Sequence, residues 1–100
     1  MLKQSPVAAE AQRQFRAQQR SATAIWKLER GCVDCGYNTI PEALEFDHIA
    51  DDKVNAVAIL VNSHAPIESI IEEMEKCEVV CANCHRGRTV ERARARRTGS

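Results

Sequence analysis

The chain has 100 residues, of which 44% are hydrophobic and 28% are charged. This length suits one small domain. Fourteen of the hydrophobic residues are alanine, and Leu, Ile, Val and Phe together number only 21, so we expect a metal ion, a disulfide or a partner chain to supplement a thin core. No apolar run is long enough for a signal peptide or a membrane span. We therefore expect a cytoplasmic protein, and in that compartment cysteines more often bind metal than form disulfides.

The formal net charge is zero, but the charges are unevenly distributed. Residues 1–31 carry six basic and two acidic side chains, and residues 79–100 carry six basic and one acidic. Between them, residues 32–78 carry two basic and eleven acidic side chains. Two basic arms thus flank an acidic centre, and this asymmetry is a better guide to partners than the summed charge.

The first predicted element is a long helix that ends at about Arg30. Ser5 is a suitable capping residue and Pro6 a suitable first helical residue. Apolar side chains then recur at three- and four-residue spacing as far as Trp26, and Gly31 ends the helix. Residues 32–43 read as a loop, and residues 44–49 as a strand.

The second half of the chain begins with an ambiguous segment, residues 50–66, which suits either a short helix or a strand. Pro66 begins a predicted helix with an apolar face. "CEVVC", residues 77–81, is a short β-branched strand. From Cys84 onward we predict a final helix that loses its apolar stripe after Val90, with residues 93–100 forming a basic, frayed tail.

Four of the five cysteines form two C-x-x-C motifs, with 45 residues between them. Two such motifs can supply four thiolates to a tetrahedral zinc ion. Free cysteines or a redox pair are the alternatives, but a redox pair needs only one motif. We expect a structural Zn²⁺, which would also compensate for the thin core. The predicted ligands are Cys32, Cys35, Cys81 and Cys84.

Asp47 and His48 interrupt the first strand with two adjacent ionisable groups, and His85 directly follows the second C-x-x-C. Because zinc would tie this strand to the last helix, we expect all three side chains in one small space. A carboxylate and an imidazole suit a divalent ion, and a further imidazole can act as a general base. This is the minimum machinery for phosphodiester hydrolysis. Singly, each residue has a structural alternative: a turn cap, a core histidine or a helix cap.

The segments "CVDC", "LEFDHI" and "EVVCANCHRGRT" occur in an order and spacing that resembles the zinc-containing branch of the HNH endonucleases, in particular the small HNH proteins of actinobacteria and their phages. The likeness covers about residues 31–90. It implies a ββα-metal unit in which Asp47 and His85 hold a catalytic divalent ion, which could be Mg²⁺, Mn²⁺, Ni²⁺ or Zn²⁺. It also implies that His48 takes a proton from the attacking water.

One position departs from the family pattern. The central asparagine of the family, which braces the active-site loop, would fall near Lys76. Asn55 and Asn62 lie in the connection and are candidates to replace it.

Together these observations predict an α+β fold with a zinc-stabilised ββα-metal (HNH) unit and an inserted helix. The expected organisation is a basic helix over residues 1–30, the HNH domain over residues 31–92 and the tail over residues 93–100. We expect Arg86, Arg88 and Arg92 to contact nucleic-acid phosphates.

The first functional hypothesis is a divalent-metal-dependent DNA endonuclease of a bacterial or phage-infected cell. The second is a non-catalytic, zinc-stapled DNA- or protein-binding adaptor of a phage DNA-packaging machine, with a terminase-type partner. The long first helix could also pair with a second copy to form a homodimer. Neither hypothesis involves a membrane.

Overall fold

The computed structural model describes residues 6–97, which form an α+β fold of four helices, a 3₁₀ turn and two strands. The coarse fold class predicted from the sequence is thereby confirmed: a long N-terminal helix precedes an antiparallel sheet and a cluster of four cysteines. The elements in chain order are α1 (Pro6–Arg30), η1 (Pro41–Ala43), β1 (Leu44–His48), α2 (Val57–Asn62), α3 (Ile67–Glu75), β2 (Cys77–Cys81) and α4 (Ala82–Arg97).

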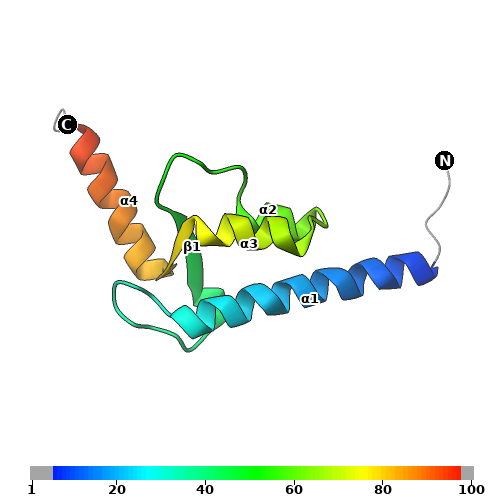
Figure 1. Ribbon diagram of the computed structural model, residues 1–100. Helices are drawn as coiled ribbons and strands as arrows, with labels where there is room; N and C mark the ends of the chain where they lie inside the picture. The colour runs from blue at the N-terminus through cyan, green and yellow to red at the C-terminus, as the bar shows by residue number, and fades with distance from the viewer. Residues whose placement is uncertain (1–5, 98–100) are drawn as a thin grey trace.

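The helix α1 is 25 residues long, as the sequence predicts, and ends at a glycine. Gly31 has a φ of +68°, which an L side chain rarely adopts, and its N–H donates to the carbonyl of Lys27 at 2.7 Å. The C-terminal part of α1 lies against the sheet and α2, whereas its N-terminal part extends past the other elements (Figure 1). The predicted cap, Ser5, lies outside the described residues.

The two strands pair antiparallel, in a register from Leu44 opposite Cys81 to His48 opposite Cys77. This register brings the second C-x-x-C, at the end of β2, beside the start of β1. The strand β1 ends at His48, one residue earlier than predicted.

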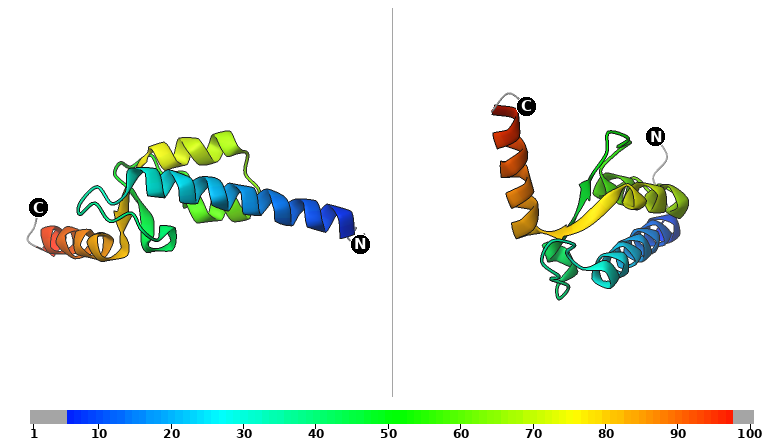
Figure 2. Two further views of the ribbon diagram at one scale, coloured as in Figure 1. Left: turned by 90° about the horizontal axis from the view of Figure 1, so that it is seen from below. Right: turned by 60° about the vertical axis from the view of Figure 1, so that its left-hand side comes forward.

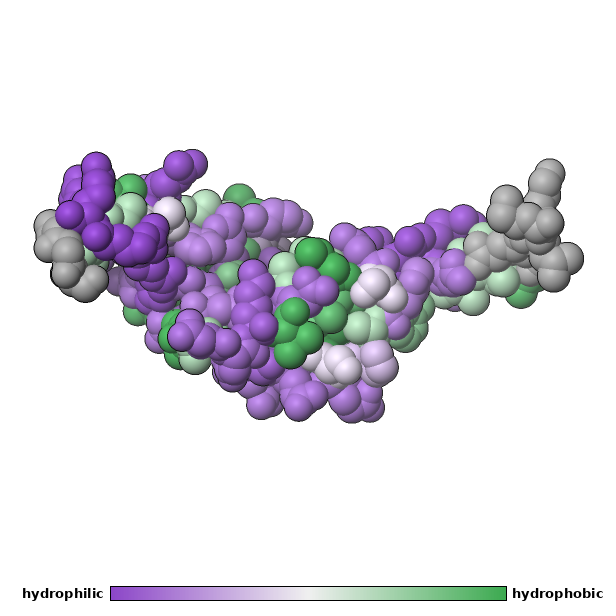
Figure 3. Space-filling view, turned by 90° about the horizontal axis from the view of Figure 1, so that it is seen from above, coloured by the Kyte–Doolittle hydropathy of each residue, from purple (hydrophilic) through white to green (hydrophobic). Residues whose placement is uncertain are grey.

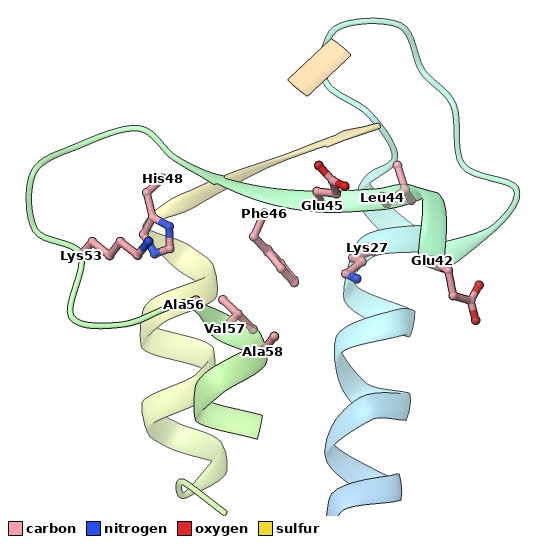
Figure 4. A pocket seen from close by; sticks show the side chains of 10 residues that line it. All are labelled: Lys27, Glu42, Leu44, Glu45, Phe46, His48, Lys53, Ala56, Val57 and Ala58. Carbon is pink, nitrogen blue, oxygen red and sulfur yellow. The ribbon is translucent and has the colours of Figure 1, made fainter. Parts of the chain in front are cut away.

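The two faces of β1 look onto different parts of the molecule, because successive strand side chains point to opposite sides. Glu45 and Asp47 bond side chains of α4. Phe46 and His48 point the other way, toward α1, α2 and α3 (Figure 4). The sheet therefore has two sides. The α4 side faces α4, and the helical side faces α1, α2 and α3.

The core consists of two clusters that share two aromatic residues. Trp26 and Phe46 are partly buried and pack against both. The first cluster lies at the end of the sheet where the four cysteines meet, and contains Cys32, Leu44, Val79, Val80 and Cys81. The second lies between α2 and α3 and contains Val57, Val61, Ile70 and Met74. Part of the ambiguous segment is thus the helix α2, whose residues are needed to complete the second cluster.

The helix α4 projects away from the rest of the molecule, at the opposite end from the start of α1 (Figures 1 and 2). It has no buried residue, and its end of the molecule is strongly hydrophilic (Figure 3). It begins two residues earlier than predicted, and residues 93–97 are helical rather than frayed. In the part of the chain that the structure describes, no helix is long and apolar enough to cross a membrane.

Candidate functional site

The cysteines of the two C-x-x-C motifs come together at one end of the sheet, and their sulfur atoms all lie within 4.8 Å of one another. The first motif forms a tight turn in which the Gly36 N–H donates to the carbonyl of Cys32 at 2.8 Å. The Val33 N–H donates to the carbonyl of Val79 at 2.9 Å, which joins this turn to β2. The clustered residues are Cys32, Cys35, Cys81 and Cys84.

The pKa values of the thiols in this cluster shift in opposite directions. Burial raises the pKa of the Cys32 thiol, but backbone N–H groups, foremost that of Cys81, lower it to about 6. Hydrogen bonds with the Cys81 and Cys32 side chains raise the pKa of the Cys84 thiol. Four thiolates so close together repel one another, and a divalent cation removes this repulsion. The sulfur donors fit a structural metal ion such as zinc, as predicted.

A second group of ionisable side chains lies on the α4 side of the sheet. Asp47 on β1 is 3% exposed, and its Oδ1 lies 3.6 Å from Nε2 of His85, in the first turn of α4. This distance is too long for a hydrogen bond. His85 Nδ1 lies 2.6 Å from Oε1 of Glu45. Metal-ligating histidines commonly donate their second N–H to a carboxylate in this way.

The sequence analysis missed Glu45. The available signal was its spacing, because Glu45 and Asp47 are two residues apart and share a face of β1.

Two arginines of α4 also hold Asp47. Arg92 donates to both of its oxygens, at 2.9 and 2.7 Å, and Arg88 Nη1 donates to Oδ2 at 2.7 Å. The Arg92 hydrogen bonds, with those of Arg88, lower the pKa of Asp47 to about 2 against the effect of burial. Arg88 further binds Asp34, at 2.7 and 2.8 Å, and Glu78, at 2.9 Å. Arg88 therefore joins the turn of the first C-x-x-C motif, both strands and α4.

The arginines predicted to bind nucleic acid thus divide into two kinds. Arg88 and Arg92 bond carboxylates of the protein, whereas Arg86 is exposed and has no ion pair with a described residue. Their contact with phosphate stays a prediction.

His48 lies apart from Asp47 and His85, on the helical side of β1. Its Nε2 is 2.8 Å from Oε2 of Glu73, which is 2% exposed. A pocket of about 340 Å³ adjoins His48, and Lys27 and Lys53 also line it (Figure 4). The structure therefore brings two of the three predicted catalytic residues together and places the third against a different carboxylate.

Glu73 is a second residue that the sequence analysis missed. It accepts hydrogen bonds from the Val54 N–H at 3.1 Å and from Lys76 Nζ at 3.1 Å. The signal was its position, because a charged residue three after Ile70 falls on the apolar face of α3.

Neither asparagine proposed for the bracing role makes the expected contact. Asn55 Oδ1 accepts only from the N–H of the next residue, at 3.0 Å, and Asn62 is exposed. Among the described residues it is Glu73 that bonds both the loop and the histidine.

Two further residues lie outside these groups. Cys77 donates to the carbonyl of Glu73 at 3.3 Å, and burial raises its pKa to about 11, which suits a structural thiol. His64 occupies a turn with a φ of 61° and packs against Phe15, with 5.9 Å between ring centroids.

Comparison with known proteins yielded no matching family model and no significant similarity to a curated protein or to a solved structure. The functional argument therefore depends on the geometry of the residues. Its firmest element is the cluster of four cysteines, which could hold a structural metal ion.

Proposed function

We propose that the chain is a divalent-metal-dependent endonuclease of the HNH type, which hydrolyses phosphodiester bonds in DNA. One observation carries the proposal: His85 is held on one nitrogen by Glu45 and presents the other to Asp47, 3.6 Å away. A buried carboxylate and an oriented imidazole beside a structural metal cluster are what a phosphodiesterase metal site requires.

Asp47 and His85 are the residues that would hold the catalytic ion. When bound, such an ion neutralises the charge of the phosphate and of the leaving oxygen. Glu45 Oε1 lies 2.6 Å from Nδ1 of His85, so Nε2 is the nitrogen that would face the ion. Arg88 and Arg92, which already converge on Asp47, lie where a phosphate at this ion would meet them.

His48 is proposed as the general base. It follows Asp47 directly at the end of β1, with its side chain on the opposite face of the strand from that of Asp47. Its Nε2 is bonded to Glu73, so Nδ1 is the nitrogen that can accept a proton from water. The pocket beside His48 gives water access to the ring.

DNA would be bound by the outward arginines of α4, which are exposed and have no ion pair with a described residue. The helical repeat places residues two apart about 200° around the axis, so Arg86 points away from the side of Arg88. Such contacts bind the phosphate backbone and carry no sequence information. The outward arginines are Arg86, Arg94 and Arg97.

The test is cleavage of supercoiled plasmid at low salt by zinc-loaded protein, with Mg²⁺, Mn²⁺, Ni²⁺ or Zn²⁺ added. We expect metal-dependent nicking by the wild type and by His64→Ala, whose histidine lies outside the site. His48→Ala and His85→Ala should keep the fold and the zinc and lose cleavage. Wild-type rates in His48→Ala would contradict the role of His48 as base.

A non-catalytic adaptor is the second candidate function, in which the zinc-stapled chain binds DNA or a protein such as a terminase. The specific observation in its favour is that Arg92 bonds both oxygens of Asp47, which are the atoms an ion would need. Calorimetry that detects no divalent ion beyond the zinc, with no cleavage by folded protein, would favour this adaptor. Light scattering separates a homodimer from an 11.2 kDa monomer.

A further inference from the structure

We propose that Glu73 is a positioning residue for His48: its carboxylate fixes the ring so that Nδ1 faces the attacking water. The inference rests on the proposed endonuclease function and deepens it. In this proposal a carboxylate on the inserted helix α3 takes the role of bracing the active-site loop. In the sequence, the candidates for that role were Asn55 and Asn62.

The first argument is the completeness of the contacts around Glu73. A buried carboxylate is costly unless its oxygens are bonded. Oε2 of Glu73 accepts from the Val54 N–H at 3.1 Å and lies 2.8 Å from His48 Nε2, and Oε1 accepts from Lys76 Nζ at 3.1 Å. Burial raises the pKa of Glu73, but these bonds lower it to below its ordinary value. The group is therefore an anion at neutral pH.

The second argument is what an anion at this place does to the ring. A carboxylate only accepts hydrogen bonds, so the nitrogen facing it must carry the hydrogen. Neutral His48 is then the Nε2–H tautomer, whose lone pair is on Nδ1. When a water proton moves to Nδ1, the water oxygen bonds to phosphorus and the bond to the leaving oxygen breaks, with solvent protonating that oxygen. Glu73 stabilises the imidazolium that results.

The third argument is that the same carboxylate also holds the loop beside the ring. The Val54 N–H bonds the same oxygen as His48, and Lys76 Nζ donates onward to the carbonyl of Asp52 at 2.9 Å. Val54 itself is 76% exposed, so its side chain contributes little packing. Glu73 on α3 and Lys76 at the end of this helix thereby position both the His48 ring and the loop.

The test compares Glu73→Gln with Glu72→Gln, a matched control at an exposed position of the same helix. Glutamine has nearly the same shape as glutamate and keeps an acceptor, so the fold should survive. Nitrogen-15 NMR of the histidine rings should show the Nε2–H tautomer of His48 in the wild type and in the control. In Glu73→Gln we expect a mixture of tautomers.

Kinetics give the second readout. In Glu73→Gln, kcat for plasmid nicking should fall about 10- to 100-fold, with KM and zinc content near wild type. Unchanged kcat and an unchanged tautomer in this variant, from an active wild type, would overturn the role of Glu73 alone. No cleavage by the wild type would overturn the endonuclease and this role together, so the two failures are distinguishable.

Discussion

Replacement of Arg88 by glutamine should destabilise the fold by about 2–3 kcal/mol, because one side chain serves three carboxylates. Most of this energy comes from Asp47, whose side chain is 4% exposed. Removing one partner of a buried pair typically costs about 3–5 kcal/mol, and here Arg92 still binds Asp47, which lowers the value. Asp34 and Glu78 are 38% and 40% exposed, so solvent screens both of these pairs and they add little to the stability.

The assay is denaturant unfolding at neutral pH with zinc present, followed by circular dichroism. Arg92→Gln should cost only about 1 kcal/mol, since Arg92 is 45% exposed and Arg88 remains. Arg94→Gln, on the outward side, is the control and should lie within about 0.5 kcal/mol of wild type. A double-mutant cycle of Arg88→Gln with Asp47→Asn should give a coupling of about 2 kcal/mol. If Arg88→Gln costs no more than Arg94→Gln, the assignment of this stability to the ion pairs is wrong.

Four further outcomes follow from the same contacts. Because the pKa of Asp47 falls from 3.8 to about 2, its contribution of about 2 kcal/mol is present above pH 4 and lost as the pH falls from 4 to 2; the unfolding free energies of wild type and Asp47→Asn, compared at each pH, measure it. Chelation of zinc, or Cys84→Ser, should unfold the first core cluster, since structural zinc contributes about 10–16 kcal/mol; a chelated protein with native dispersed NMR signals would contradict this. Arg92→Gln should bind Mn²⁺ several-fold more tightly by calorimetry, because Arg92 competes for Asp47; equal affinity would show that it does not compete. Replacing three outward arginines by glutamine should reduce the slope of log affinity for duplex DNA against log salt by about 2 to 3; an unchanged slope would exclude them from the interface.

The parts of the fold that the sequence predicts are those set by local patterns. The three- and four-residue spacing of apolar side chains located α1 and α3, and the paired C-x-x-C motifs located the cysteine cluster. The end of α4 was missed because its apolar stripe stops early, yet alanine and arginine are both strong helix formers and continue the helix to Arg97. The short helix α2 depends on packing in the second cluster, which periodicity over six residues cannot show.

The candidate site was only partly predictable, for a different reason. Each predicted side chain lies in a recognisable motif, but its partner comes from a distant part of the chain. His48 bonds Glu73, 25 residues away, and His85 bonds Glu45, 40 residues away. These pairings depend on the strand register and on which face of β1 each helix covers. Local sequence patterns predict neither of these.

The spacing of the two C-x-x-C motifs has a consequence for how the chain folds and how it can change. The first motif is closed by its own backbone hydrogen bond, whereas pairing of β2 with β1 brings the second beside it. Capture of the last two sulfurs and closure of the intervening loop are then one event, whose entropic cost rises slowly with loop length, by about 0.6 kcal/mol per doubling. Insertions between β1 and β2 should therefore reduce the stability of the fold only slightly. A longer connection would still have to place a carboxylate beside His48, as Glu73 does.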